Sequence, residues 1–159
     1  MVRVGIGTDR HRLVFGRKLI IGGVHVPHAK GAGGHSDADA LTHAVIDALL
    51  GAAALGDIGH HFPDTDPKWK DANSLVLLAK TLDILKSAGY QPVNIDASVH
   101  LEAPKLERLK LEMSANLAGA LQLERHWVNV KAKTGEGMDA VGAGELIEAL
   151  AIAQVSTMK

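Results

Sequence analysis

The chain has 159 residues, 47% of them hydrophobic, which is typical of one domain with a well-filled core. Its 17 basic and 18 acidic side chains give a formal net charge of -1. We therefore expect no general attraction to nucleic acid or to an anionic membrane. The absence of cysteine excludes disulfides, thiolate zinc sites and cysteine nucleophiles, so any zinc site must use histidines and carboxylates.

The N-terminal residues MVRVGIGTDRH lack the basic and apolar segments of a secretory signal and the composition of a transit peptide. No apolar run approaches the ~20 residues that span a bilayer. These features predict a soluble, cytoplasmic protein with one domain over residues 1–159.

The first predicted elements are a strand and a hairpin. Apolar residues at positions 2, 4 and 6 alternate with Arg3 and Gly5, which is the period of a half-buried strand running into residues 8–11. The segment KLIIGGVHVP contains two short apolar pieces around Gly22 and Gly23. This pattern predicts a hairpin or bulge.

A helix is predicted over residues 37–55, where apolar residues recur at helical spacing. Ser36, with Asp39 three residues later, resembles a capping box and marks the beginning of this helix. His35 directly precedes that cap, so it is placed at a helix N-terminus, where backbone N–H groups favour phosphate. The stretch GDIGHHFPDTDPKWKDA lacks periodicity and predicts a long loop.

The second half of the chain is predicted to alternate helices and strands. An apolar stripe after Asn73 or Ser74, ended by Gly89, predicts a helix, and the alternation over residues 93–101 predicts a strand. Pro104 is predicted to open a third helix, and residues 128–132 form another strand before a glycine-rich loop. The last segment, ELIEALAIAQV, is ambiguous between strand and helix.

Asp9, His11 and His43 are candidate ligands of one metal ion. Alternate residues of a strand project to the same side, so Asp9 and His11 can approach one ion together. His43 shares a face of the predicted helix with Asp39 and Asp47, either of which can orient its second ring nitrogen. One carboxylate and two imidazoles suit zinc, and three ligands leave a fourth position for water or substrate.

A structural hydrogen bond between Asp9 and His11 explains the D-x-H pattern equally well. For most other histidines, solvated loop or strand positions are the favoured interpretation. These are His25, His28, His60, His61 and His126.

Five motifs occur in order: GTDRH, GGHSDADALTHA, ALGDIGHHFPDTD, EAPKL and VKAKTGE. Together they resemble the cyclodiphosphate synthase family of the non-mevalonate isoprenoid pathway, over nearly the whole chain. The resemblance implies a phosphorus-oxygen lyase that converts 4-diphosphocytidyl-2-C-methyl-D-erythritol 2-phosphate to 2-C-methyl-D-erythritol 2,4-cyclodiphosphate and CMP. The 2-phosphate of the substrate attacks its β-phosphorus, so no protein nucleophile is needed.

The resemblance also implies an α+β subunit with a sheet covered by helices on one side and a final strand. The subunits assemble as a homotrimer with active sites between neighbours. Such a site leaves the protein mainly with positioning the substrate and neutralising its charge.

The same resemblance assigns roles to individual residues. Asp9, His11 and His43 hold Zn²⁺ on the β-phosphate, and Mg²⁺ or Mn²⁺ near Glu136 bridges the diphosphate. His35 and Thr134 stabilise the transition state. The other substrate contacts comprise a phosphate-binding part, a ribose-binding part, a mobile loop over the methylerythritol and a cytosine pocket: Arg10, Ser36, Asp57, Ile58, Gly59, Phe62, Pro63, Asp64, Thr65, Asp66, Leu101, Glu102, Ala103, Pro104, Lys105, Leu106, Glu107, Lys133 and Gly135.

Several of these residues also have simple structural explanations. Asp57 can cap a turn, Pro104 can start a helix, and Thr134 can fill an edge strand. A lone loop carboxylate such as Glu136 is usually solvated.

Two departures from the family pattern affect what the resemblance implies. Lys133 stands where many members of the family have threonine, and this difference is expected to alter the contacts with the cytosine. Ala140 and Ala143 replace an aromatic residue and an arginine near the trimer axis. Because arginine is the usual bidentate partner of a diphosphate, the substitution argues against regulation by an isoprenoid diphosphate there.

Two other classes of protein remain as alternatives. In a zinc phosphohydrolase the open metal position activates water, which requires a general base near the metal. In a non-catalytic metal-binding or assembly protein the histidines hold zinc only, and the D-I-G, F-P-D-T-D and A-P-K-L motifs have no use as a linked set.

Overall fold

The computed structural model describes residues 1–158 and has an α+β fold built on a mixed five-stranded sheet. The strands β5 (Tyr90–His100) and β6 (Val128–Lys133) are parallel, and the other neighbouring pairs are antiparallel. The strands lie in the order β4 (Lys30–Ala32), β1 (Val2–Phe15), β7 (Leu146–Thr157), β5 and β6. A separate hairpin consists of β2 (Leu19–Ile21) and β3 (Val24–Val26), and it turns at Gly22 and Gly23 as predicted.

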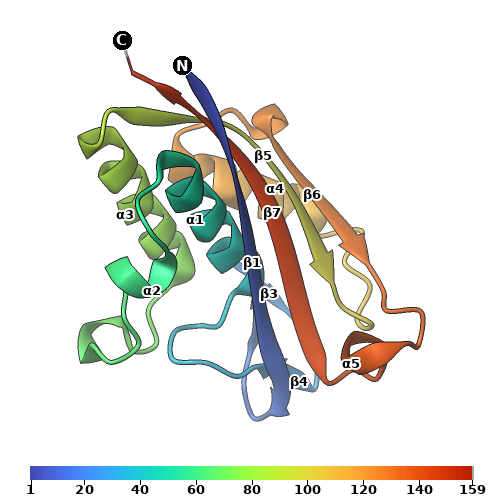
Figure 1. The fold of residues 1–159 in the computed structure, drawn as a ribbon. Coiled ribbons are helices and arrows are strands. Elements are labelled where there is room, and N and C mark those ends of the chain that lie inside the picture. The colour runs from blue at the N-terminus through green and yellow to red at the C-terminus, as the bar shows by residue number, and fades with distance from the viewer. Residues whose placement is uncertain (159) are drawn as a thin grey trace.

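The long helices pack on one face of the sheet, as Figure 1 shows. The three long ones are α1 (Ala40–Ala53), α3 (Ser74–Ser87) and α4 (Lys110–Leu121). The short elements are the α-helices α2 (Ile58–His61) and α5 (Asp139–Gly142) and the 3₁₀ helices η1 (Pro67–Trp69) and η2 (Arg125–Trp127). Over residues 1–158, no helix combines the length and apolar character needed to cross a bilayer. The predicted fold class is confirmed.

The predicted start of the first long helix is wrong by three residues. α1 begins at Ala40, because Asp39 and not Ser36 is its N-cap and accepts a hydrogen bond from the Thr42 N–H at 3.0 Å. Ala38 has a φ of 55°, so the backbone before Asp39 does not follow a helical path. His35 and Ser36 therefore lie in the loop between β4 and α1, outside the helix terminus.

Asp39 also ties the β2–β3 hairpin to the beginning of α1. Its carboxylate is fully buried and accepts hydrogen bonds from the Gly22 and Gly23 N–H groups at 2.9 and 2.8 Å. The Thr42 hydroxyl donates a further bond to it at 2.7 Å. Burial raises the pKa of Asp39, although these hydrogen bonds oppose the shift. Asp39 therefore fixes the β2–β3 hairpin against the first turn of α1, the helix that carries His43.

Three other predictions about elements are corrected or settled. The third helix begins at Lys110 and not at Pro104, which follows a cis peptide bond in the turn after β5. The predicted long loop contains α2 and η1, capped by Asp57 and Asp66. The ambiguous last segment is strand β7, whose buried residues alternate and which pairs with both β1 and β5.

The two faces of β1 have opposite roles. Gly5 and Gly7 face α1 so closely that a Cβ on either would overlap a helix carbonyl oxygen, that of Ala44 in the case of Gly7. The apolar side chains that alternate with these glycines point to the uncovered face of the sheet, where Val4 and Ile6 are 64% and 65% exposed. The strand is half-buried as predicted, but its buried side is the glycine side.

We expect the Gly7→Ala substitution to lower the free energy of unfolding by about 3 kcal/mol, at the upper end of what overpacking costs, because the overlapping atom is backbone and cannot rotate away. Gly119→Ala in α4 is the matched control, since a Cβ there has no atom within 4 Å. That control should be neutral or stabilising by about 0.5–1 kcal/mol. Urea unfolding of both variants measures the difference, and equal stability would contradict the close approach of β1 and α1.

Candidate active site and metal centre

Strand β1 and helix α1 bring Asp9, His11 and His43 together on the helix side of the sheet. Asp9 Oδ2 lies 2.8 Å from His11 Nε2 and 3.1 Å from His43 Nδ1. One ligand atom from each residue falls within 4.8 Å of the other two, an arrangement that can hold a metal ion. The imidazole rings meet edge to face, with centroids 5.6 Å apart.

In both histidines, the ring nitrogen that faces away from Asp9 has a hydrogen-bond partner. His11 Nδ1 lies 3.0 Å from the Gly33 carbonyl oxygen. His43 Nε2 lies 2.8 Å from Ser74 Oγ and 3.2 Å from Ser36 Oγ. Such contacts orient metal-binding imidazoles in many proteins.

The prediction that Asp39 or Asp47 orients His43 is wrong. Asp39 caps α1 and holds the hairpin, and Asp47 accepts a hydrogen bond from the Ile58 N–H at 2.7 Å. Ser74 could not be predicted as a partner of His43, because nothing in the sequence indicates that the beginning of α3 packs beside this histidine.

Mutual electrostatics stabilise the charged forms of Asp9 and His43. Burial raises the pKa of Asp9, but the neighbouring imidazoles of His11 and His43 favour the charged carboxylate, outweigh burial and lower the pKa to about 2. Burial lowers the pKa of His43, but the hydrogen bond and charge of Asp9 outweigh it, so the net shift is upward. Without a metal, a proton on His43 therefore partly balances the carboxylate, and a bound cation would take its place.

His11 provides the observation that best matches a metal ligand. Its Nε2 atom is buried and, within residues 1–158, has no hydrogen-bond partner, although the Asp9 carboxylate lies 2.8 Å away. A buried nitrogen without a partner is costly unless it has another use. One carboxylate and two imidazoles that converge from rigid elements are a donor set suited to zinc.

A cavity of about 560 Å³ opens beside this group of ligands. His35 contributes to its wall, and the buried His35 Nε2 has no hydrogen-bond partner among the described residues. Phe62 and Trp69 meet edge to face in the wall, with ring centroids 5.1 Å apart. The cavity wall contains the predicted site residues His11, His35, Ser36, His43, Ile58, Gly59, Phe62, Pro63, Asp64 and Thr65. It also contains Gly34, Trp69 and Leu77, which were not predicted from the sequence.

A second cavity, of about 310 Å³, lies where β5 and β6 end. The loop after β6 is braced by a hydrogen bond from the Thr134 hydroxyl to Glu136 Oε1 at 3.0 Å and by one from the Gly135 N–H to Glu102 Oε2 at 2.8 Å. The predicted site residues in its wall are Leu101, Pro104, Lys105, Leu106, Glu107, Lys133, Thr134 and Glu136. Over residues 1–158 the two cavities share no lining residue.

Some predicted contacts lie in neither wall. Arg10 points to the uncovered face of the sheet, because it alternates with Asp9 and His11, and there it pairs with Glu148 at 2.9 Å. Asp57 and Asp66 cap short helices beside the first cavity. Glu102 and Ala103 line a small neighbouring cavity, and Gly135 is held by Glu102.

Comparison with known proteins connects this geometry to one family. The profile of the YgbB family matches residues 2–156. A protein of Desulfosudis oleivorans, named 2-C-methyl-D-erythritol 2,4-cyclodiphosphate synthase, is 56% identical over 97% of this chain and 92% of its own length. The bifunctional IspDF from Campylobacter jejuni superposes with a TM-score of 0.95 and 38% identity, over 100% of this chain and 43% of that chain.

A CDP-bound structure of a 2C-methyl-D-erythritol-2,4-cyclodiphosphate synthase is 36% identical. It superposes with a TM-score of 0.88, over 97% of this chain and 100% of that one. Similarity over nearly full length, in sequence and in fold, leads to one conclusion. The chain belongs to the YgbB family, alongside enzymes that bear the name 2-C-methyl-D-erythritol 2,4-cyclodiphosphate synthase.

Proposed function

We propose that the chain converts 4-diphosphocytidyl-2-C-methyl-D-erythritol 2-phosphate to 2-C-methyl-D-erythritol 2,4-cyclodiphosphate and CMP in isoprenoid precursor synthesis. The observation that carries the proposal is the group of Asp9, His11 and His43, which can hold a metal ion, beside a cavity that His35 also lines. Residues 1–159 act as one synthase domain in the cytoplasm on this small molecule, without nucleic acid or membrane.

The metals of the proposed site are Zn²⁺ and a harder divalent cation. Asp9, His11 and His43 hold Zn²⁺, and Glu136 lies near Mg²⁺ or Mn²⁺. When bound, these ions neutralise and polarise the diphosphate oxygens. The donor sets support the assignment, because imidazole suits zinc and a lone carboxylate suits an oxygen-coordinated cation that stays largely on its substrate.

The protein side chains position the substrate and stabilise the charge that develops. His35 and Thr134 donate hydrogen bonds to phosphate oxygens in the transition state, and Ser36 contacts the same phosphates. The segment Phe62–Asp66 covers the methylerythritol, while Asp57, Ile58 and Gly59 contact the ribose. The substrate phosphate is its own nucleophile, so correct placement of the reacting atoms accounts for most of the catalysis.

The second cavity would receive the cytidine part of the substrate. Leu101–Glu107 and Lys133 line or adjoin it, and they provide both apolar surface and charge. The lysine at position 133 would lie against the cytosine or its phosphates, where it adds a positive charge to the pocket.

We infer that the site is completed by assembly into a homotrimer. Within one chain the His35 cavity and the Thr134 cavity are separate, although the reaction needs both sets of residues. The uncovered face of the sheet carries apolar side chains, among them Val4, Ile6 and Ile152, of which the last is 44% exposed. A sheet face of this kind supports burial against further copies of the chain.

The function is tested with purified protein, the proposed substrate, Zn²⁺ and Mg²⁺. We expect CMP and the cyclic diphosphate to form in equal amounts. Phosphorus NMR of the reaction mixture measures both products. Chelation of the metals should abolish both products, and returning the ions should restore them. Linear products or inorganic phosphate would instead identify a zinc phosphohydrolase, and an inert zinc-loaded protein would point to a binding or assembly role.

A further inference from the structure

His43 lies at the end of a chain of hydrogen bonds that no assigned role of the site explains. Its Nε2 atom faces Ser74 Oγ at 2.8 Å, and Ser74 Oγ in turn is hydrogen-bonded to Asp37 Oδ1. Ser74 is fully buried and opens α3, while Asp37 belongs to the loop before α1. Neither residue belongs to the group of ligands that can hold the metal.

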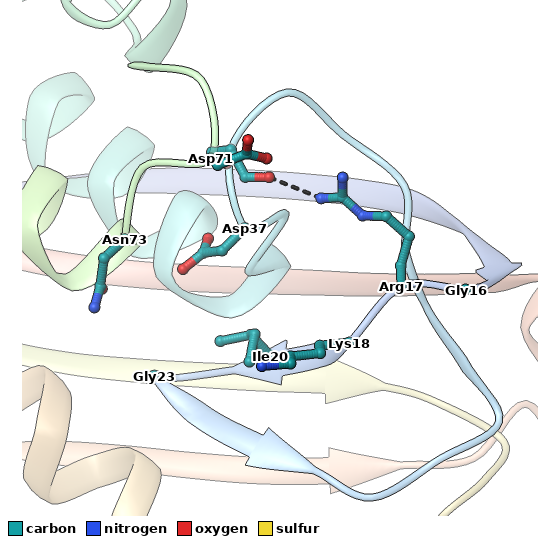
Figure 2. A pocket seen from close by; sticks show the side chains of 9 residues that line it. Gly16, Arg17, Lys18, Ile20, Gly23, Asp37, Asp71 and Asn73 are labelled. Atoms are coloured by element: carbon teal, nitrogen blue, oxygen red, sulfur yellow. Dashed lines mark hydrogen bonds between the residues drawn. The ribbon is translucent and has the colours of Figure 1, made fainter. Parts of the chain in front are cut away.

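The position of Asp37 is fixed by several bonds at once. Its Oδ2 accepts a hydrogen bond from the Ser74 N–H at 2.9 Å, and its Oδ1 accepts one from the Asp39 N–H at 3.2 Å. Figure 2 shows Asp37 pointing toward Asn73 in the wall of a cavity of about 540 Å³. In the same cavity wall, Arg17 donates a hydrogen bond to the Ser36 carbonyl oxygen at 2.8 Å, which holds the backbone next to Asp37.

The supply of hydrogens determines the direction of each bond in this chain. Ser74 Oγ has one hydrogen, and a carboxylate can only accept, so that hydrogen points to Asp37. Toward His43 Nε2 the same oxygen can then only accept. Nε2 must therefore carry a hydrogen, which leaves the lone pair of a neutral His43 on Nδ1, the atom that faces Asp9.

We propose that Asp37 and Ser74 form a positioning relay that fixes the hydrogen of His43 on Nε2 and turns its metal-binding lone pair toward Asp9 and His11. The relay rests on the proposed zinc site and adds two positioning residues to it. His11 needs no side-chain relay, because its Nδ1 faces a backbone carbonyl oxygen that accepts a hydrogen bond directly.

Asp37→Asn tests the direction of the relay, because the amide has nearly the same shape as the carboxylate. If the amide oxygen keeps its bond to the Ser74 N–H, the NH₂ group faces Ser74 Oγ and donates to it. The Ser74 hydrogen then turns to His43 Nε2 and favours the form of His43 whose Nδ1 carries a hydrogen. We expect zinc to bind about 10–100-fold more weakly than in the unmodified protein, as when other outer partners of metal ligands are lost.

Ser74→Ala tests the hydroxyl itself. The Ser36 hydroxyl, 3.2 Å from His43 Nε2, remains as an acceptor, so the loss of zinc affinity should be smaller than for Asp37→Asn. Ser114→Ala is the matched control, because Ser114 is also a buried serine whose hydroxyl donates a hydrogen bond, here to the Val128 carbonyl oxygen. That variant should keep the zinc affinity unchanged.

Zinc affinity is measured by competition with a chromophoric chelator, and thermal unfolding in EDTA reports separately on the fold of each variant. If the unmodified protein binds zinc and both relay variants bind it equally tightly, the relay is overturned while the zinc site stands. If the unmodified protein binds no zinc, both ideas are overturned together.

A second measurement needs no substitution. Two-bond ¹H–¹⁵N correlation spectra of the zinc-loaded protein should show His43 with its hydrogen on Nε2 and the metal on Nδ1. Zinc on Nε2 would overturn the relay whatever the behaviour of the variants.

Discussion

Replacing His43 by Ala should remove bound zinc and synthase activity together. The substitution deletes one of three converging ligands, and it leaves Asp9 without the imidazole 3.1 Å away. Because loss of outer partners alone typically costs about 10–100-fold in metal affinity or activity, loss of a ligand should cost more than about 100-fold. Zinc content by atomic absorption and CMP release in the same preparations measure the two losses.

The control for this substitution is another histidine outside the site. His126 is exposed, 58% by its side chain, and pairs with Glu124 at the surface. His126→Ala should therefore keep full zinc content and activity. Full activity in a zinc-free His43→Ala protein would contradict the metal assignment, and so would a zinc-loaded variant with normal affinity.

The part of the site that could be predicted from the sequence follows from local geometry. Asp9 and His11 are two residues apart on a strand, and strand periodicity alone places them on one side. The fold class, the hairpin at Gly22 and Gly23 and most elements could likewise be predicted from hydrophobic periodicity and turn residues. That His43 joins Asp9 was a hypothesis from residue types, strengthened by family resemblance.

The rest of the site depends on contacts between distant segments, which no local pattern encodes. Ser74 reaches His43 only because α3 packs beside α1. The two residues are 31 positions apart in the sequence. The cap at Asp39 was misplaced because Ser36 is an equally good capping residue, and the positive φ at Ala38 that decides between them has no signal in an alanine.

Which side of β1 is buried could not be predicted from its composition, for a related reason. In an isolated strand with one buried face, valine and isoleucine are expected to face the core. Here α1 approaches so closely that only Gly5 and Gly7 fit beneath it, and the apolar residues face outward. An outward apolar face of this kind is typical of a surface that contacts a partner, and strand periodicity alone does not tell such a face from one that packs on the core. The same face provides the strongest structural support for the proposed trimer.

Mixed oligomers of two inactive variants should regain activity if each site is shared between neighbours. His43→Ala disables the first cavity, and Thr134→Ala disables the second by removing a hydroxyl, with an expected loss of about 100–1000-fold. In a cyclic trimer that contains both variants, one interface joins an intact first cavity to an intact second cavity. About one third of the unmodified activity is expected, whichever variant contributes two copies.

Co-expression with two different affinity tags, followed by purification on both, isolates the mixed oligomers, and light scattering gives their mass. Each variant alone, purified in the same way, sets the background. If His35, His43 and Thr134 served the same site from one chain, every copy in the mixture would lack an essential group and activity would stay at that background. Recovery to about one third would therefore assign the two cavities to different subunits, because no rearrangement within one chain can restore both.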